Sequence, residues 1–379
     1  PEWGIEPVPK EHKILRGIDL FVLWSSLGVG LLVLVAGSLL VPGLSLIDAF
    51  VVSLIGSLIG SALLAAAGII GSEYSIAAAN ISGPILGSYT RIFWTIIFAI
   101  WCAALAIGGP LVFVRKWLER VAIWLVYLST IWITIQVLTR PETWNLFMKP
   151  GDGTLPMLLA LDLVIAMPIS WWPLISDYNR FSSTSKGGFL GTFLGYTVAN
   201  TWFYFLGAAL VMIMGVTDVI SSIATLIFGN LALILILVDE TDNCFADIYS
   251  TAVSIQNIAP KTRQWKLIVS TTIIGLILAA TIPLTEYEWF LLMIGGLFVP
   301  LLGVLISEYA VRQKGGGFDI SEFYDEAPKI RIRTIFSWFA GIAAYFLIAN
   351  FFPELGASMP SFILSASLNL LLGILKKGA

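Results

Sequence analysis

The residues best suited to chemistry form an acidic stretch inside an otherwise apolar segment. Asp239, Glu240, Asp242 and Asp247 interrupt an apolar run that ends at Ile258. Each carboxylate at the centre of a membrane helix costs about 2.5–3.5 kcal/mol on insertion scales, so such residues usually face water, an ion or a partner. The stretch therefore predicts a functional site within a membrane helix, with a polar helix end near the membrane surface as the alternative.

A helical projection gathers most of these polar residues on one side. At 100° per residue, one broad face carries Asp239, Asp242, Asn243, Ala246, Asp247 and Ser250. Glu240 lies at the edge of this face, and Thr241, Phe245 and Ile248 point the other way. A face of carboxylates and a carboxamide suits a hard cation such as Na⁺, proton transfer, or hydrogen bonds to the amidine edge of a pyrimidine.

Two other segments contain signals for a break within a membrane helix. One includes Gly28 and Gly30, and each Gly weakens a helix by about 1 kcal/mol relative to Ala. The other includes Pro168 and Pro173, and a proline removes a backbone donor and clashes with the preceding turn. Transporters built from inverted repeats often carry such broken helices, whose freed backbone groups bind substrate or ion. These four residues are therefore predicted hinges, although Gly and Pro are also common in ordinary membrane helices.

The second of these segments also carries aromatic residues that suit a flat ligand. Trp171 and Trp172 lie between the two prolines, where they can either stack on a ring or pack in the core. Asp162, earlier in the same segment, is a second acid that is either intramembrane or interfacial.

The remaining reactive residue types exclude several classes of function. Cys102 and Cys244 lie far apart in apolar runs and predict neither a disulfide nor a metal site. The single histidine, His12, lies in the polar N-terminal segment, and the spans contain no HExxH-like motif, so the sequence does not predict an enzyme. The sequence has no basic patch with interleaved aromatic residues, so it does not predict a nucleic-acid partner. The residues before Arg16 lack the apolar region of a cleavable signal peptide.

The composition indicates that the elements holding these residues lie in a lipid bilayer. Of the 379 residues, 58% are hydrophobic and 12% are charged, whereas soluble domains carry about 25% charged residues. The mean hydropathy is +0.91. A crossing needs about 20 apolar residues. Measured against this length, the sequence contains eleven candidate segments, and they are Ile18–Val41, Ala49–Ile70, Ile92–Val114, Val121–Leu138, Leu155–Ser176, Phe189–Met214, Leu226–Ile258, Leu267–Ile282, Phe290–Ile306, Ile335–Phe352 and Ser361–Leu375.

The distribution of basic residues predicts one further crossing after the second segment. With an additional crossing between Gly71 and Ile92, all 21 Lys and Arg residues lie in the cytoplasm except Arg91, Arg140 and Lys149. The residues between these two positions are too short and too polar to cross well, so we infer that a third helix is missing near Thr90. A re-entrant segment over Ser72–Tyr89 is the alternative.

Three motifs resemble the nucleobase:cation symporter family. They are the opening Trp3-Gly4-Ile5-Glu6-Pro7-Val8-Pro9, the Ile169-Ser170-Trp171-Trp172-Pro173-Leu174 break followed by Ser176-Asp177-Tyr178-Asn179-Arg180-Phe181, and the acidic stretch with Ala246-Asp247-Ile248-Tyr249-Ser250 after it. The acidic stretch is most similar to the branch assigned to hydroxymethylpyrimidine, the thiamine precursor. Cytosine permeases and the hydantoin transporter are more distant relatives.

The resemblance implies an all-α polytopic membrane protein with a LeuT-type fold. This fold has a 5+5 inverted repeat and two further helices, twelve in all, and the third helix is the one missing from the sequence. The expected division is a cytoplasmic segment 1–17, a first repeat 18–139 with helices 1, 2, 4 and 5, an external loop 140–154, a second repeat 155–311 with helices 6–10, a cytoplasmic loop 312–334, and helices 11–12 with the tail over 335–379.

The resemblance also implies where the ligands bind. In the relatives the substrate lies between helices one, three, six and eight, and Ser170 and Trp171 match the substrate-facing residues of helix six. Asp242 and Asn243 lie where Na⁺-coupled relatives have two adjacent hydroxyl residues, so this chain departs from the pattern and the choice between Na⁺ and H⁺ stays open.

These observations predict a symporter that imports a pyrimidine such as hydroxymethylpyrimidine by alternating access. The expected substrate-binding residues are Ser170, Trp171, Trp172, Gly28, Asp239 and Asp247. The expected cation-binding residues are Gly28, Leu31, Asp242 and Asn243. No cofactor is expected beyond the coupling cation, and the expected location is the cell membrane with both termini cytoplasmic. A nucleobase or hydantoin permease is the alternative, an amino-acid or amine symporter of the same fold is less favoured, and a channel is a further rival.

Overall fold

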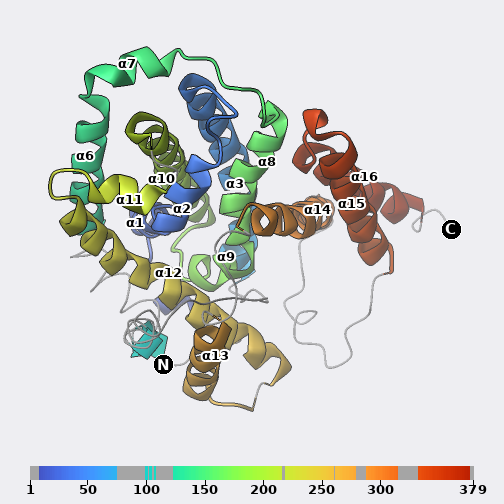
Figure 1. Ribbon diagram of the computed structural model, residues 1–379. Helices are drawn as coiled ribbons and strands as arrows, with labels where there is room; N and C mark the ends of the chain where they lie inside the picture. Colours follow the sequence, from blue (N-terminus) through green and yellow to red (C-terminus); the bar gives the residue numbers. More distant parts are fainter. Residues whose placement is uncertain are drawn as a thin grey trace.

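The computed structural model describes residues 8–74, 99–100, 102–104, 106–107, 123–215, 218–259, 261–278, 287–314 and 332–375. Most of these residues lie in helices, and no strand occurs among them (Figure 1). The predicted third crossing and most of the alternative re-entrant segment lie outside the described residues. The same holds for most of the predicted segment Ile92–Val114, of which residues 99–107 are helical where they are described.

The first half of the chain begins with a broken helix that is followed by a long helix. Its helices are α1 (Gly17–Leu27), α2 (Leu31–Ser38), α3 (Leu46–Tyr74), α6 (Ile123–Leu138) and α7 (Pro141–Phe147), preceded by the short 3₁₀ turn η1 (Lys10–His12). Helix α7 lies within the predicted external loop. It begins at Pro141, a position where the missing N–H of proline has no helical partner to lose.

The second half repeats the arrangement of a broken helix followed by a long one. Its helices are α8 (Met157–Ser170), α9 (Trp172–Asn179), α10 (Ser185–Met214), α11 (Val219–Ala224), α12 (Gly229–Ile258), α13 (Gln264–Leu278) and α14 (Tyr287–Lys314). The chain ends with α15 (Ile332–Phe351), the 3₁₀ turn η5 (Pro353–Leu355) and α16 (Ser358–Leu375). Apart from Ile92–Val114, each predicted segment coincides with one of these helices or with a pair of them.

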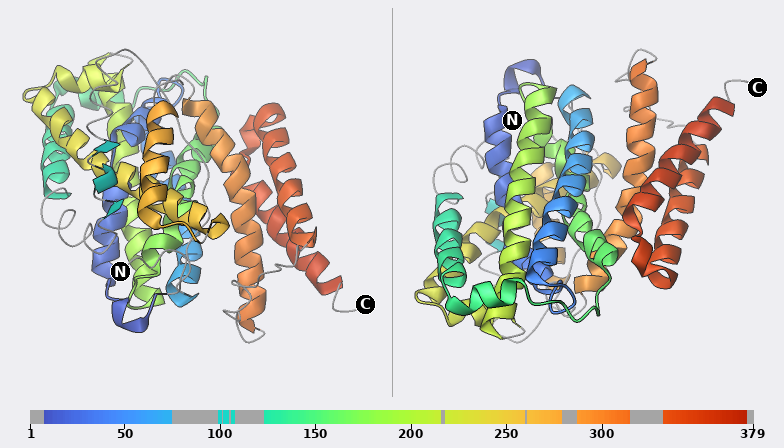
Figure 2. Two further views of the ribbon diagram at one scale, coloured as in Figure 1. Left: turned by 90° about the horizontal axis from the view of Figure 1, so that it is seen from below. Right: turned by 90° about the horizontal axis from the view of Figure 1, so that it is seen from above.

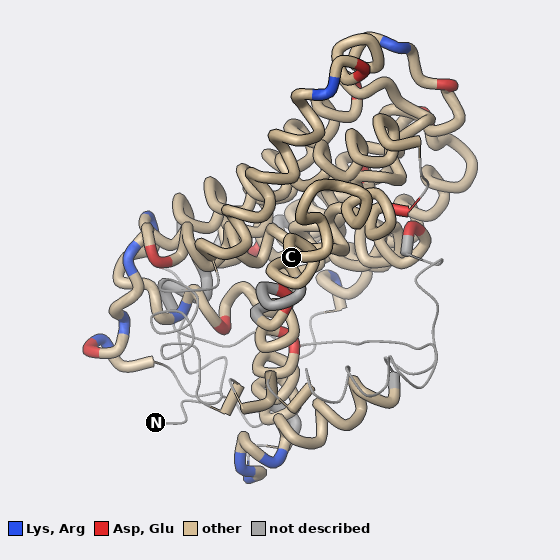
Figure 3. Tube along the Cα trace, turned by 60° about the vertical axis from the view of Figure 1, so that its left-hand side comes forward, with Lys and Arg blue, Asp and Glu red and all other residues tan. Residues whose placement is uncertain are grey.

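Length and composition allow five of the described helices to cross a membrane singly, or up to seven spans if each bent pair counts as one. The single helices are Leu46–Ile69, Met157–Asn179, Ser185–Met214, Glu288–Ala310 and Ile332–Phe351. The bent pairs are α1 with α2, at 57°, and α6 with α7, at 80°. Helix α12, which carries the acidic stretch, is not in this set. Figure 3 shows Lys and Arg gathered toward the ends of the molecule, whereas acidic positions also occur along a helix in its middle.

Glycines allow the helices beside the break to approach one another closely. A Cβ on Gly195 of α10 would collide with the carbonyl oxygen of Phe21 in α1, and one on Gly207 would collide with the carbonyl oxygen of Leu34 in α2. Small residues of this kind are the usual means by which membrane helices pack backbone to backbone. Both halves of the first broken helix therefore rest directly on α10.

The last two helices form a flank beside α14, away from the centre of the bundle (Figure 2). Asp162 of α8 joins this flank to the bundle, because its two carboxylate oxygens accept hydrogen bonds from the backbone N–H groups of Ala357 and Ser358, at 2.6 and 2.9 Å. A carboxylate at a helix N-terminus satisfies donors that have no partner within the helix. Asp162 is thus a buried cap for α16, which neither of the two sequence interpretations of this acid anticipated.

Candidate substrate and ion site

The first broken helix, here called helix one, consists of α1 and α2 with Gly28, Val29 and Gly30 between them. The last bonds of α1 are from Gly28 N–H to the Trp24 oxygen, at 3.1 Å, and from Val29 N–H to the Ser26 oxygen, at 2.9 Å. The first backbone bond of α2 runs from Leu34 N–H to the Gly30 oxygen, at 3.2 Å. The N–H groups that precede Leu34 in α2 must therefore find acceptors outside the helix.

Glu240 of α12 supplies one of these acceptors. Its Oε1 atom accepts a hydrogen bond from the backbone N–H of Leu31 at 2.5 Å, and its Oε2 atom accepts one from Asn243 Nδ2 at 2.8 Å. A Cβ on Gly30 would lie 2.7 Å from Glu240 Oε1 and 3.2 Å from Asn243 Nδ2, so a larger residue would force the carboxylate to move from this position. The partial positive charge of a helix N-terminus favours an anion at this point.

The structure thus brings together some of the predicted cation-binding residues and adds one that the prediction did not include. Leu31 and Asn243 both bond to one carboxylate at the break, and that carboxylate belongs to Glu240. Glu240 and Asn243 are three residues apart, a spacing that places two side chains on one side of a helix. A projection centred on Asn243 would have found this pair. The side chains of Asp239 and Asp242 lie outside the described part of the structure.

The accessible side of α12 is narrower than the predicted polar face. Glu240, Asn243 and Cys244 are half-buried, and Asp247, one turn further along, is exposed. Thr241, Phe245 and Ile248 are buried on the opposite side, as expected. Ala246 and Ser250, which the projection placed on the polar face, are also buried.

The second broken helix, here called helix six, consists of α8 and α9 and is interrupted only at Trp171. Backbone hydrogen bonds continue through the interruption, from Trp171 N–H to the Pro168 oxygen at 3.2 Å and from Leu174 N–H to the Trp171 oxygen at 3.0 Å. The two parts form a single span, Met157–Asn179. Pro173 lies in the first turn of α9, where no helical acceptor is lost, and Pro168 lies near the end of α8.

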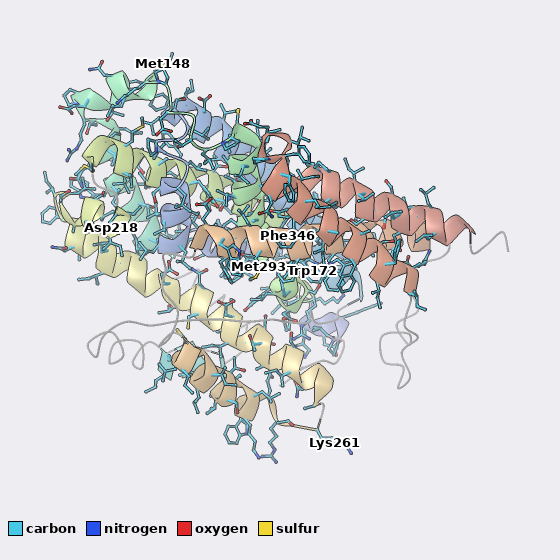
Figure 4. The ribbon with its side chains drawn as sticks, turned by 45° about the vertical axis from the view of Figure 1, so that its right-hand side comes forward. Met148, Trp172, Asp218, Lys261, Met293 and Phe346 are labelled. Atoms are coloured by element: carbon cyan, nitrogen blue, oxygen red, sulfur yellow. The ribbon has the colours of Figure 1, made fainter. Side chains whose placement is uncertain are left out.

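The side chains at the helix-six interruption have different surroundings. Ser170 is half-buried, and its hydroxyl donates to the Met167 carbonyl oxygen at 2.7 Å. The Trp172 ring packs against Phe298 of α14, with 5.5 Å between the ring centroids. Figure 4 shows Trp172 on the same side of the molecule as the labelled Met293 of α14. Trp171 is half-buried and packs at the margin of the core that includes residues of α1, α9 and α12.

A buried aromatic cluster closes the space on the α1 side of the break. Trp24 of α1 donates from Nε1 to Asn179 Oδ1 at 2.9 Å, and its ring meets Tyr178 edge-on at 6.3 Å. Phe245 and Tyr249 of α12 complete the cluster, with their rings stacked at 5.9 Å. Helix one, helix six and α12 therefore share one packed layer next to the break.

The segment before α1 is hydrogen-bonded to the chain that follows α9, at the end of this aromatic layer. Leu15 N–H donates to the Phe181 oxygen at 2.9 Å, and Ser183 N–H donates to the Leu15 oxygen at 2.7 Å. Beside this pairing, Arg180 is fully buried and donates from Nη2 to the Tyr249 hydroxyl at 3.1 Å. These contacts join the segment before α1 to helix six and α12 at this end of the layer.

Comparison with solved structures shows the same fold. The nucleobase-cation-symport-1 family transporter Mhp1, in a closed conformation with bromovinylhydantoin bound, matches with a TM-score of 0.71 at 15% identity, over 97% of this chain and 93% of that chain. The inward-facing conformation of Mhp1 matches with a TM-score of 0.63 at 14% identity, over 98% of this chain and 92% of that chain. The predicted LeuT-type fold is therefore confirmed.

Comparison of sequences gives the family. No curated protein matches the chain significantly. The profile of a family described as permeases for cytosine/purines, uracil, thiamine and allantoin matches residues 93–365, which is more than half of the chain. This match confirms the resemblance at the level of the family, and it indicates a multi-pass membrane transporter rather than an enzyme. The chain belongs to the family of permeases for cytosine and purines, uracil, thiamine and allantoin.

Proposed function

We propose that this protein is a cation-coupled symporter that imports a pyrimidine, with hydroxymethylpyrimidine as the first candidate, and so serves the uptake of a thiamine precursor. The observation that carries the proposal is the meeting of the helix-one break with the polar side of α12, at Leu31, Glu240 and Asn243. Broken helices at this point are where transporters of this architecture bind substrate and ion. The family match and the acidic stretch around Asp247 support the choice of a pyrimidine.

In this proposal the ring stacks on Trp171 and is held by polar groups on both sides. Ser170, the backbone at Gly28, and the carboxylates of Asp239 and Asp247 supply hydrogen bonds to the ring nitrogens and the amino group. Trp172 contributes to the pocket wall through its packing on Phe298. Carboxylates suit an aminopyrimidine because its amino group is a donor that a carboxylate accepts.

The co-transported cation, Na⁺ or H⁺, binds in this proposal between helix one and α12. Gly28 and Leu31 provide backbone groups, and Asp242 and Asn243 provide side-chain oxygens. The closeness of Leu31 and Asn243, joined through Glu240, supports this location. Binding of the cation favours the outward-open state, so that the cation gradient drives import by alternating access.

The membrane orientation follows from the basic residues. We place both termini in the cytoplasm of a cell membrane, because this arrangement leaves only Arg91, Arg140 and Lys149 of the 21 Lys and Arg residues outside. The layer of Trp24, Tyr178 and Tyr249 then lies on the cytoplasmic side of the break. Gating by alternating access would require this layer to open.

A permease for cytosine, another nucleobase or a hydantoin is the second candidate. The structural relative Mhp1 has bromovinylhydantoin bound, which supports a flat heterocycle without choosing among the rings. An amino-acid symporter is less favoured, because the helix N-terminus that would hold a substrate carboxylate already carries Glu240.

A thermal-shift screen on the detergent-solubilised protein tests the substrate. The panel contains hydroxymethylpyrimidine, thiamine, cytosine, uracil, hydantoins and amino acids, each with and without Na⁺. A bound ligand raises the Tm by mass action. We expect the largest shift with hydroxymethylpyrimidine, and a larger one when the coupling cation is present. A shift only with cytosine or a hydantoin would move the proposal to the second candidate, and a shift with none of the rings would overturn it.

Uptake into proteoliposomes tests the cation site. We expect Asp242→Ala to abolish concentrative uptake while the protein keeps its fold, since the carboxylate is proposed to hold the cation. Asp152→Ala, in an exposed loop beyond the bundle, is the matched control and is expected to transport normally. Concentrative uptake by Asp242→Ala would remove Asp242 from the site.

A further inference from the structure

The N-terminus of α2 points to a further determinant of specificity. In transporters with broken helices, the N-terminal ends of the half-helices usually hold the anionic group of the substrate. Here that position is already filled from within the protein, because Glu240 accepts the Leu31 N–H. We infer that Glu240 is a specificity-determining residue, an internal anion that excludes carboxylate-bearing ligands and restricts the site to neutral or cationic rings. This inference rests on the proposed function, because it assumes that the substrate is a ring compound that binds at the helix-one break.

The geometry shows that the carboxylate is a built-in part of the break. Both oxygens of Glu240 accept hydrogen bonds, from Leu31 N–H at 2.5 Å and from Asn243 Nδ2 at 2.8 Å. Gly30 leaves the space that the carboxylate fills, since a Cβ there would lie 2.7 Å from Oε1. A ligand carboxylate could reach the Leu31 N–H only by displacing Glu240.

The remaining polar groups at this position also select against anions. Asn243 Oδ1, next to Glu240, is a buried acceptor that has no hydrogen-bond partner among the described residues. Asp247, on the same side of α12, is a second acid, and it is exposed whereas Glu240 is half-buried. A ligand that satisfies these groups must bring N–H donors or positive charge, as an aminopyrimidine does and a carboxylate does not.

No basic side chain on helix one offsets this negative charge. Residues 20–39, which include the second half of α1, the break and all of α2, contain no ionisable side chain. Arg180 is buried in the aromatic layer, where it donates to Tyr249 and to the Asp177 carbonyl oxygen. Two like charges at hydrogen-bond distance repel strongly in a partly buried site. The break therefore disfavours an anion by charge as well as by occupancy.

The experiment compares matched pairs of ligands that differ by a carboxylate. The pairs are hydroxymethylpyrimidine with its 5-carboxylate analogue, and uracil with orotate. Affinities are measured by titration calorimetry on the detergent-solubilised full chain, for the wild type, Glu240→Ala and Glu240→Gln. Asp218→Asn is the matched control, because Asp218 caps the N-terminus of α11 through Ser221 N–H at 2.8 Å, and this hydrogen bonding holds the pKa of its carboxyl below the ordinary value.

We expect the wild type and Asp218→Asn to favour the uncharged member of each pair. Glu240→Ala, which frees the N-terminus, should bind the carboxylates about tenfold more tightly than the wild type does. Glu240→Gln should gain less, because its amide oxygen can still accept the Leu31 N–H. If Glu240→Ala does not fold, a severalfold gain in Glu240→Gln still supports the inference, since that substitution removes the charge and keeps the acceptor.

The inference is overturned if the wild type binds the carboxylates as tightly as the uncharged rings. It is also overturned if neither substitution of Glu240 raises the affinity for a carboxylate. A wild type that binds neither uncharged ring would count against the proposed pyrimidine substrate. A gain of carboxylate binding in Glu240→Ala would support the role of Glu240 even then, so the two failures are distinguishable.

Discussion

Helix one and helix six occupy matching places in the two halves of the chain, yet their interruptions differ in kind. The two parts of helix one meet at 57° across Gly28, Val29 and Gly30, and a side chain from the distant helix α12 fills the gap. Helix six is interrupted at Trp171 alone, and its backbone hydrogen bonds continue through the interruption. The helix with glycines is thus the more strongly broken, although proline is the stronger helix breaker.

The position of the prolines explains this difference. Pro173 lies in the first turn of α9, where its missing N–H has no helical acceptor to lose, and Pro168 lies near the end of α8. Gly30 does more than weaken a helix, since its lack of a Cβ lets Glu240 reach the backbone of Leu31. The break in helix one therefore persists because α12 satisfies a backbone group that the break exposes.

The largest effect is expected from closing the gap in helix one. In Gly30→Val the added carbon atoms would displace Glu240, and overpacking of this kind typically costs about 1–3 kcal/mol. We expect uptake of the substrate into proteoliposomes to fall by about tenfold or more. Gly275→Ala in α13 is the matched control, because a Cβ there has open space, and it is expected to transport normally. Normal uptake by Gly30→Val would show that the break does not need the Glu240 contact.

A smaller effect is expected from removing the hydrogen bond that joins helix one to helix six. The hydrogen bond from Trp24 Nε1 to Asn179 Oδ1 joins α1 to α9, and Asn179 Nδ2 donates onward to Thr192 Oγ1 at 3.0 Å. Asn179→Leu leaves the buried indole N–H without this acceptor, which typically costs about 1–3 kcal/mol. We expect a lower Tm in detergent. In the double variant with Trp24→Phe the loss should be less than the sum of the single losses, and strict additivity would contradict a direct link.

Asp162 and Glu240 each cap the N-terminus of a helix, but only Glu240 lies at the candidate site. Asp162→Asn keeps one acceptor for Ala357 and Ser358 and turns the other into a donor that faces a donor. We expect a loss of stability of about 1–2 kcal/mol, measured as a lower Tm. The preference for uncharged over carboxylated rings should not change, in contrast to the Glu240 variants. A change in that preference would mean that Asp162 also acts on the site.

The smallest effect is expected at the proline of helix six. Pro173→Ala in the first turn of α9 should lower the stability by about 1 kcal/mol, through the loss of buried ring carbons and the greater entropy of the unfolded chain. Uptake should stay close to that of the wild type. Uptake that falls as far as in Gly30→Val would mean that the proline, and not only the sequence around Trp171, determines the shape of helix six.

The membrane character, the helical class and the positions of most spans can be predicted from the sequence alone. Runs of about 20 apolar residues with few charges can fold stably only as helices in a bilayer, because the backbone must satisfy its own hydrogen bonds there. The glycines of helix one and the acidic stretch of α12 also identified the region of the candidate site in advance. These features are local, so they are visible in a single chain without knowledge of its contacts.

Which of these polar and aromatic residues contact one another depends on the packing of the helices. Glu240 reaches Leu31, 209 positions away in the chain, because α12 crosses helix one at Gly30. Asp162 became a cap for α16 because the loop after α15 returns to α8. Trp172 packs on Phe298 because the α8 part of helix six, which ends just before Trp172, lies against α14. A helical projection gives the direction of a side chain from its own helix only, and the partner that satisfies it comes from the packing of helices that are distant in sequence.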